Sequence, residues 1–158
     1  MKAKEIEILI YNPFHLSRIL HHFVSSVFSV NNIGVKTELI YLVIPLILNQ
    51  KVSDKLRTLN KNSKFISIIE DHSLEPEICQ LDIDIERTKT KTKHGLIILA
   101  NTIQLKISDF ITSEVVIDYK TEKDLVLKPI YKAAHILGMM IGKESYLTVI
   151  SKLKIKNI

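Results

Sequence analysis

Histidines are the first candidates for chemistry in this chain, because imidazole binds metal ions and moves protons near neutral pH. Three of the six histidines are close together in the sequence: His15, His21 and His22. The other three are scattered along the chain: His72, His94 and His135. A metal site needs further Cys, Asp or Glu ligands at close spacing, and the three clustered histidines have none nearby. We interpret them as solvated or partner-facing side chains, and we predict neither a metal site nor a cofactor.

The nucleophiles and carboxylates show no catalytic pattern. Cys79 is the single cysteine, and it follows Ile78 in a setting where burial is the ordinary fate of a lone thiol. The chain has no Gly-x-Ser-x-Gly segment, and its four glycines form no phosphate-binding loop. On a helix, three alternating carboxylates would spread over different faces: Asp82, Asp84 and Glu86. We therefore expect a protein that is not an enzyme.

The best candidate for nucleic-acid contact is the segment from Thr88 to Gly95, in which lysines alternate with threonines. Lysine and threonine both bind phosphate oxygens, so Lys89, Lys91 and Lys93 could contact a DNA backbone. No arginine follows Arg87 there, and arginine is the commonest reader of base edges, so base-specific recognition is not expected. A solvated loop and a basic patch that faces an acidic partner are the alternatives.

Composition places these residues in one compact unit. The chain has 158 residues, of which 46% are hydrophobic and 25% charged, and its net charge of +5 permits contact with acidic surfaces. A single cysteine forms no internal disulfide, which favours a reducing cytoplasm. The longest apolar run, 39–48, is much shorter than the roughly 20 residues of a membrane span. No segment has the order of a signal peptide.

The clearest element is a helix over 13–30. Asn12 is a favoured N-cap, and Pro13 suits the first helical position. Behind them the apolar residues recur at helical spacing and leave one polar side, which predicts an amphipathic helix that packs on its own domain or on a partner. We expect more apolar helical surface than the chain can bury alone.

The remaining pattern predicts a mainly α fold with little sheet. Alternation over 5–11 favours a short strand or an extended arm. A nearly all-apolar helix kinked at Pro45 is expected over 37–49. Further helices are expected over these ranges: 53–59, 64–69, 73–87, 93–104, 129–142 and 145–154. A polar junction over 88–95 and two strands over 105–107 and 114–119 complete the pattern. A helix followed by a hairpin is typical of a winged helix, so we predict a helical part over 1–72 and a winged-helix-like part over 73–158.

Several of these segments together resemble a known family. In order and spacing, the chain is similar to the small middle component of three-component ABC-ATPase systems, the bacterial defence operons of the Lamassu type. The segments that carry this resemblance cover nearly the whole chain: 12–16, 40–48, 132–138, 146–148 and 153–155.

The resemblance implies a non-catalytic adaptor in anti-phage or anti-plasmid defence. Such a subunit would link an SMC/Rad50-like ABC ATPase to an effector, commonly a nuclease, and DNA backbone contact could occur within the complex. The candidate partner-binding residues lie in the amphipathic helix and the two last helices: Asn12, Pro13, Phe14, Phe23, Phe28, Tyr131, Lys132, Leu137 and Tyr146. The alternative is a free-standing winged-helix DNA-binding regulator, which would bind DNA alone in a salt-dependent way.

Overall fold

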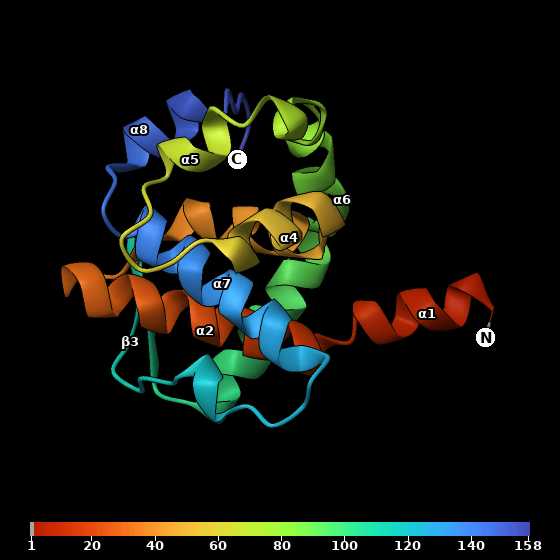
Figure 1. The fold of residues 1–158 in the computed structure, drawn as a ribbon. Helices are drawn as coiled ribbons and strands as arrows, with labels where there is room; N and C mark the ends of the chain where they lie inside the picture. The colour runs from red at the N-terminus through yellow and green to blue at the C-terminus, as the bar shows by residue number, and fades with distance from the viewer. Residues whose placement is uncertain (1) are drawn as a thin grey trace.

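The predicted helix over 13–30 forms α2 (Pro13–Asn31), the central helix of the computed structural model, which describes residues 2–158 (Figure 1). Asn12 caps α2, because its side-chain oxygen accepts the Phe14 N–H at 2.9 Å, and Pro13 occupies the first helical position. The helix ends at Asn32, whose φ of 57° lies in the left-handed region. The expectation for this element is confirmed.

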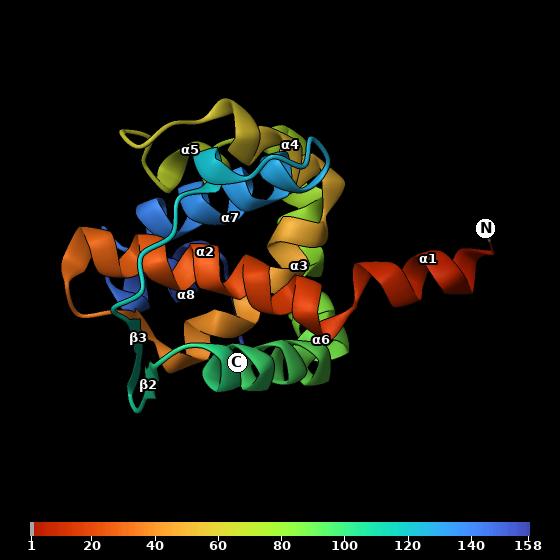
Figure 2. The same cartoon turned by 90° about the horizontal axis from the view of Figure 1, so that it is seen from below.

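Helix α2 lies between two others, α6 (Glu75–Thr102) and α7 (Leu127–Ile141), as Figure 2 shows. Its apolar stripe is in the core, and the polar side is buried too. His22 and Ser26 are covered, although the sequence predicts a solvated side there. That prediction is wrong, because neighbouring segments cover both sides of the helix.

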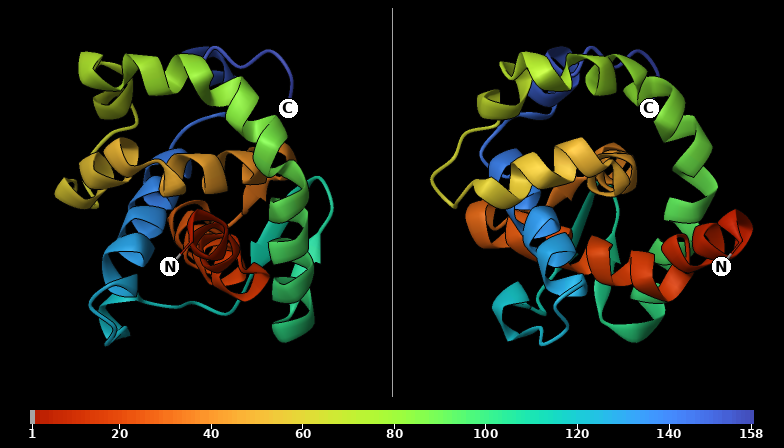
Figure 3. Two further views of the ribbon diagram at one scale, coloured as in Figure 1. Left: turned by 90° about the vertical axis from the view of Figure 1, so that its right-hand side faces the viewer. Right: turned by 45° about the vertical axis from the view of Figure 1, so that its right-hand side comes forward.

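Helix α6 is continuous over 28 residues and bends around the other helices (Figure 3). The sequence predicts instead a helix over 73–87, a junction over 88–95 and a second helix over 93–104, and this division is wrong. The inward positions keep helical spacing along the whole helix: Leu81, Ile85, Thr88, Thr92, Gly95 and Leu99. Within the junction, the small or polar residues Thr88, Thr92 and Gly95 occupy these positions. These residues are buried, so the apparent gap in the apolar pattern is a region of close packing against α2.

Helices α2 and α7 cross at short distance because small residues line their contact. A Cβ added at Gly138 would lie 2.5 Å from the Phe23 carbonyl oxygen and still closer to the Ser26 hydroxyl. Ala133 and Ala134 are fully buried one turn earlier. The small-residue block of 133–138 therefore supports helix packing.

The helices between α2 and α6 are short. A 3₁₀-helix (Thr37–Leu42) leads into α3 (Val43–Leu48), so the predicted single helix over 37–49 is divided before Pro45, which stands in the first turn of α3. Next come α4 (Gln50–Thr58) and α5 (Ile66–Ile69), and α8 (Tyr146–Lys152) follows α7. Two further 3₁₀ turns are short: His72–Leu74 and Tyr119–Thr121.

Of the described helices, none combines the length and the apolar character of a membrane span.

A small antiparallel sheet covers one end of α2. Its strands β1 (Val35–Lys36), β2 (Leu105–Ile107) and β3 (Phe110–Ser113) lie in the order β1-β3-β2. Val35 pairs with Ile111, so the sheet joins the two halves of the sequence, and β1 has no counterpart in our prediction. The mainly α expectation with a small hairpin is confirmed.

The predicted strand over 114–119 is absent from the structure, because its backbone bonds to α2 side chains. The Ile117 N–H donates to the Ser25 hydroxyl at 3.1 Å, and His21 Nε2 lies 2.9 Å from the Val115 carbonyl oxygen. These bonds also explain why the polar side of α2 is buried.

The expected strand over 5–11 is also wrong, since α1 (Ala3–Ile10) occupies most of it. No neighbouring strand pairs with this segment, so a helix is the structure that satisfies its backbone groups internally. Glu5 accepts the Lys2 N–H at 2.9 Å and begins the helix. Figures 1 and 2 show α1 projecting from the body of the molecule.

Candidate partner-binding surfaces

The most exposed apolar element is α1. None of its residues is buried, and four large apolar side chains are at least 40% exposed: Ile6, Ile8, Leu9 and Ile10. Phe14, in the first turn of α2, follows α1 closely in the sequence and is 65% exposed. We call α1 together with Phe14 the apolar arm. Contiguous exposed apolar side chains of this kind mark interaction sites more often than isolated ones do.

Lys91 holds the arm against α6. Its ammonium lies 3.4 Å from a Glu7 carboxylate oxygen and 3.4 Å from the centre of the Tyr11 ring. Tyr11 itself is half-buried and packs against the core. The direction of the arm is therefore set at its base, while its apolar side chains stay accessible.

Asn12, Pro13 and Phe14, three of the predicted partner-binding residues, lie at this base. Asn12 and Pro13 start α2 through the cap described above, which is a structural role. Phe14 points outward, and it is the one predicted aromatic anchor with a largely exposed side chain. The structure thus leaves Phe14 available to a partner.

Three other predicted anchors lie in the core. Phe23 and Leu137 have no exposed surface, and Tyr131 is 3% exposed. Phe23 lies on α2, which packs against α6 and α7, and Tyr131 and Leu137 lie on α7, which packs against α2 and α4. We therefore correct their assignment to core residues. Phe28 and Tyr146 are half-buried.

Lys132 serves the fold as well. Its ammonium donates to the Arg57 carbonyl oxygen at 2.6 Å, in the last turn of α4. A cation at this end of a helix satisfies an orphan carbonyl and complements the helix dipole. Lys132 therefore caps α4 and fixes it to α7, and its contact with a partner stays a prediction.

The lysine series 89–93 lies on helix α6 rather than on a loop. Lys89 is within 3.3 Å of Glu86, and Lys91 holds the arm, whereas Lys93 is exposed. Residues two apart on a helix point about 200° apart, so the three ammonium groups do not form one row. Contact with nucleic acid stays a prediction for these residues.

His15 and His22 of α2 lie beside Tyr131 of α7, which also carries His135, whereas His21 faces the Val115 carbonyl oxygen. His22 is 2% exposed and stacks on Tyr131 at a ring distance of 4.5 Å. Burial, aided by the Arg18 charge, lowers the pKa of His22 to about 3, and burial also lowers the pKa of His15, His21 and His135. Our interpretation of these residues as solvated is wrong for His21 and His22, which are buried.

The remaining candidates for chemistry lie apart from these histidines. Cys79 is exposed, contrary to the burial that its setting predicts. Asp82 and Asp84 are half-buried on α6, while Glu86 is exposed. Among residues 2–158, no three His, Cys, Asp or Glu side chains are placed to hold a metal ion.

A small, mainly helical protein with an exposed apolar arm is the class that the fold and the surface define. The chain belongs to the family described as ABC-three component (ABC-3C) system Middle Component 3, whose model matches residues 2–157. It is therefore a middle component of a three-component ABC ATPase system. The comparisons with curated proteins and with solved structures found no match.

Proposed function

We propose that this middle component is a non-catalytic adaptor, which links an SMC/Rad50-like ABC ATPase to an effector such as a nuclease in Lamassu-type anti-phage or anti-plasmid defence. The observation that carries this proposal is the apolar arm. An eight-residue helix with no buried residue contributes little to the core, so its apolar side chains are best explained by a partner.

The small size of the arm limits the area that it can bury against a partner. A two-turn helix presents too little area for a stable interface alone, since stable interfaces bury about 1,200 Å² or more. Binding energy is concentrated in a few apolar or aromatic anchors, and Leu9 and Phe14 supply two of them. The arm would therefore supply anchors within a larger interface.

The first prediction tests the arm. Ile6→Asp with Leu9→Asp should reduce co-purification of the chain with the ABC ATPase component by at least about tenfold, because two charges would enter the apolar contact. The folded body should be unaffected, since both residues are exposed. Ile33→Asp is the matched control, because Ile33 is 59% exposed at the far end of α2. Undiminished binding by a folded arm variant would remove the arm from the proposal.

One observation favours the second candidate, a winged-helix DNA-binding regulator. The order α2, β1, α3, α4, α5, α6, β2, β3 with sheet order β1-β3-β2 is similar to the connectivity of a winged helix, with additional short helices between β1 and α6. This arrangement would span both predicted halves, because β1 lies at residues 35–36. Sequence-selective, salt-dependent DNA binding by the isolated chain would favour the regulator over the adaptor.

A further inference from the structure

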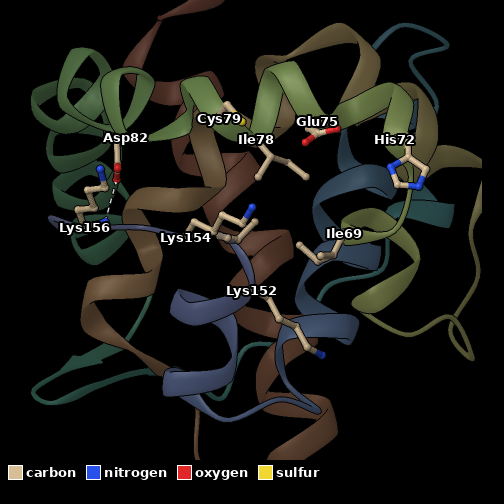
Figure 4. Close-up of a pocket in the computed structure, with 10 residues that line it drawn as sticks. Ile69, His72, Glu75, Ile78, Cys79, Asp82, Lys152, Lys154 and Lys156 are labelled. Atoms are coloured by element: carbon tan, nitrogen blue, oxygen red, sulfur yellow. Dashed lines mark hydrogen bonds between the residues drawn. The ribbon is translucent and has the colours of Figure 1, made fainter.

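A groove separates the N-terminal half of α6 from the segment that follows α8 (Figure 4). It encloses about 380 Å³, and its floor is apolar, with Ile69, Ile78 and Leu153. The volume is within the range of about 300–1,000 Å³ in which proteins bind small ligands and side chains. The groove lies outside the apolar arm and outside the histidine cluster.

One edge of the groove is cationic. Lys152, Lys154 and Lys156 line it, and the residues between them, Leu153 and Ile155, are buried in the core. Burial of the alternate residues leaves the lysines on the outer side of the segment. Asp82 accepts the Lys156 backbone N–H at 3.3 Å and holds the segment beside α6.

Lys154 is the lysine available to a ligand. Its φ of 55° lies in the left-handed region, which is unusual for a residue with a side chain. Figure 4 shows the side chain reaching over the groove between Ile78 and Ile69. Lys152 is 3.6 Å from Glu144, whereas Lys154 is exposed and makes no ion pair with any residue that the structure describes.

The opposite edge is one face of α6. Glu75, Ile78, Cys79 and Asp82 line it at helical spacing, so the face carries a carboxylate at each end and an apolar centre. Asp82 lies seven positions after Glu75, which corresponds to about 10 Å, or two helical turns. The groove thus has an apolar floor between a cationic edge and an acidic edge.

We infer that this groove binds about two turns of an amphipathic helix from another protein component of the ABC-3C system. Its apolar side chains would enter the floor, a row of carboxylates would face Lys154 and Lys156, and a basic group would face Glu75. Charge complementarity of this kind selects a partner and fixes its direction in the groove. The inference rests on the proposed adaptor function and adds a second contact to the arm.

Cys79 provides the test, because it is the single cysteine and lies in the groove. The full chain is treated with N-ethylmaleimide alone and after co-expression with the ABC ATPase and third components of its system, and labelling is followed by mass spectrometry. We expect Cys79 to react in the isolated chain, and to react at least about tenfold more slowly in the complex because the groove is filled.

The outcomes separate the two proposals. Full reactivity of Cys79 in an assembled complex overturns the groove and leaves the adaptor function intact, whereas failure of any complex to form overturns both. Protection by duplex DNA alone, or by self-association of the isolated chain, also overturns the inference, because the occupant would then be a nucleic acid or a second copy.

A charge reversal tests the direction of binding. Lys154→Glu should weaken assembly by about tenfold and restore Cys79 labelling, since it places like charges at the edge of the groove. The variant should remain folded, because the Lys154 side chain is exposed and makes no ion pair with the described residues. Lys123→Glu, also exposed, is the matched control and should have no effect. Equal assembly by both variants would contradict the proposed charge pairing.

Discussion

At the scale of single residues, His22 couples the core to pH. Neither of its ring nitrogens has a hydrogen-bond partner among the described residues, and Tyr131 covers one face of the ring. Burial therefore favours the neutral ring and lowers its pKa from 6.5 to about 3, with Arg18 and His135 adding to the effect and Asp118 opposing it. As pH falls below 6.5, the unfolded chain binds a proton that the folded protein does not, and stability is lost down to about pH 3.

We predict that His22→Phe will reduce the loss of stability between pH 7 and pH 5. The variant keeps a ring against Tyr131 and removes the titrating group, so about 2 kcal/mol of the acid-induced loss in the free energy of unfolding should disappear at pH 5. Urea denaturation at both pH values measures this quantity. His94→Phe is the control, because His94 is exposed. An unchanged pH dependence in the His22 variant would show that the buried ring does not carry the effect.

At the scale of elements, the crossing of α2 and α7 depends on Gly138. An added methyl group would meet the Phe23 carbonyl oxygen, which belongs to a buried helix backbone with little freedom to move. Segment 132–138, one of those that resemble the family, thus has two structural roles. Its small residues allow α7 to pack closely on α2, and Lys132 caps α4.

Gly138→Ala should lower the free energy of unfolding by about 2–3 kcal/mol, as overpacking of a tight core does. Thermal and chemical denaturation would measure the change. Gly142→Ala is the comparison, since its nearest contact would be 3.1 Å and a small shift relieves it. If the two variants are equally stable, the close approach of α2 and α7 does not depend on the missing side chain.

Helices and strands could be predicted from the sequence where the signals that determine them are local. Helices α2 and α7 could be predicted because the Asn12 cap of α2 and the apolar spacing of both helices are local signals. The continuity of α6 was missed because Thr88, Thr92 and Gly95 occupy inward positions, although their spacing carries the signal. Strand 114–119 was wrongly expected because its backbone partners, His21 and Ser25, lie more than 90 residues away.

The candidate site was predicted only in part, for a related reason. An apolar helical stripe has the same pattern whether it faces the core or a partner, so Phe23 and Phe14 could not be distinguished from the sequence. The groove was missed because Glu75 and Lys154 are 79 positions apart, and only tertiary packing brings their segments to one cavity.

At the scale of the whole molecule, α1 contributes no buried residue to the folded body. We predict that deleting residues 2–10 will change the free energy of unfolding by less than about 1 kcal/mol, because the deletion mainly removes the exposed ion pair between Glu7 and Lys91. Thermal denaturation followed by circular dichroism measures this. By contrast, Leu137→Ala should cost about 2–5 kcal/mol, since Leu137 is fully buried. A shortened chain that loses its cooperative transition would show that the arm is part of the folding unit.

The arm continues directly into α2 through Asn12 and Pro13, without a flexible linker. Tyr11 packs against the core and Asn12 caps α2, so the turn between the two helices is fixed at both of its residues. A partner bound to α1 would therefore be held at a defined place relative to the helical body.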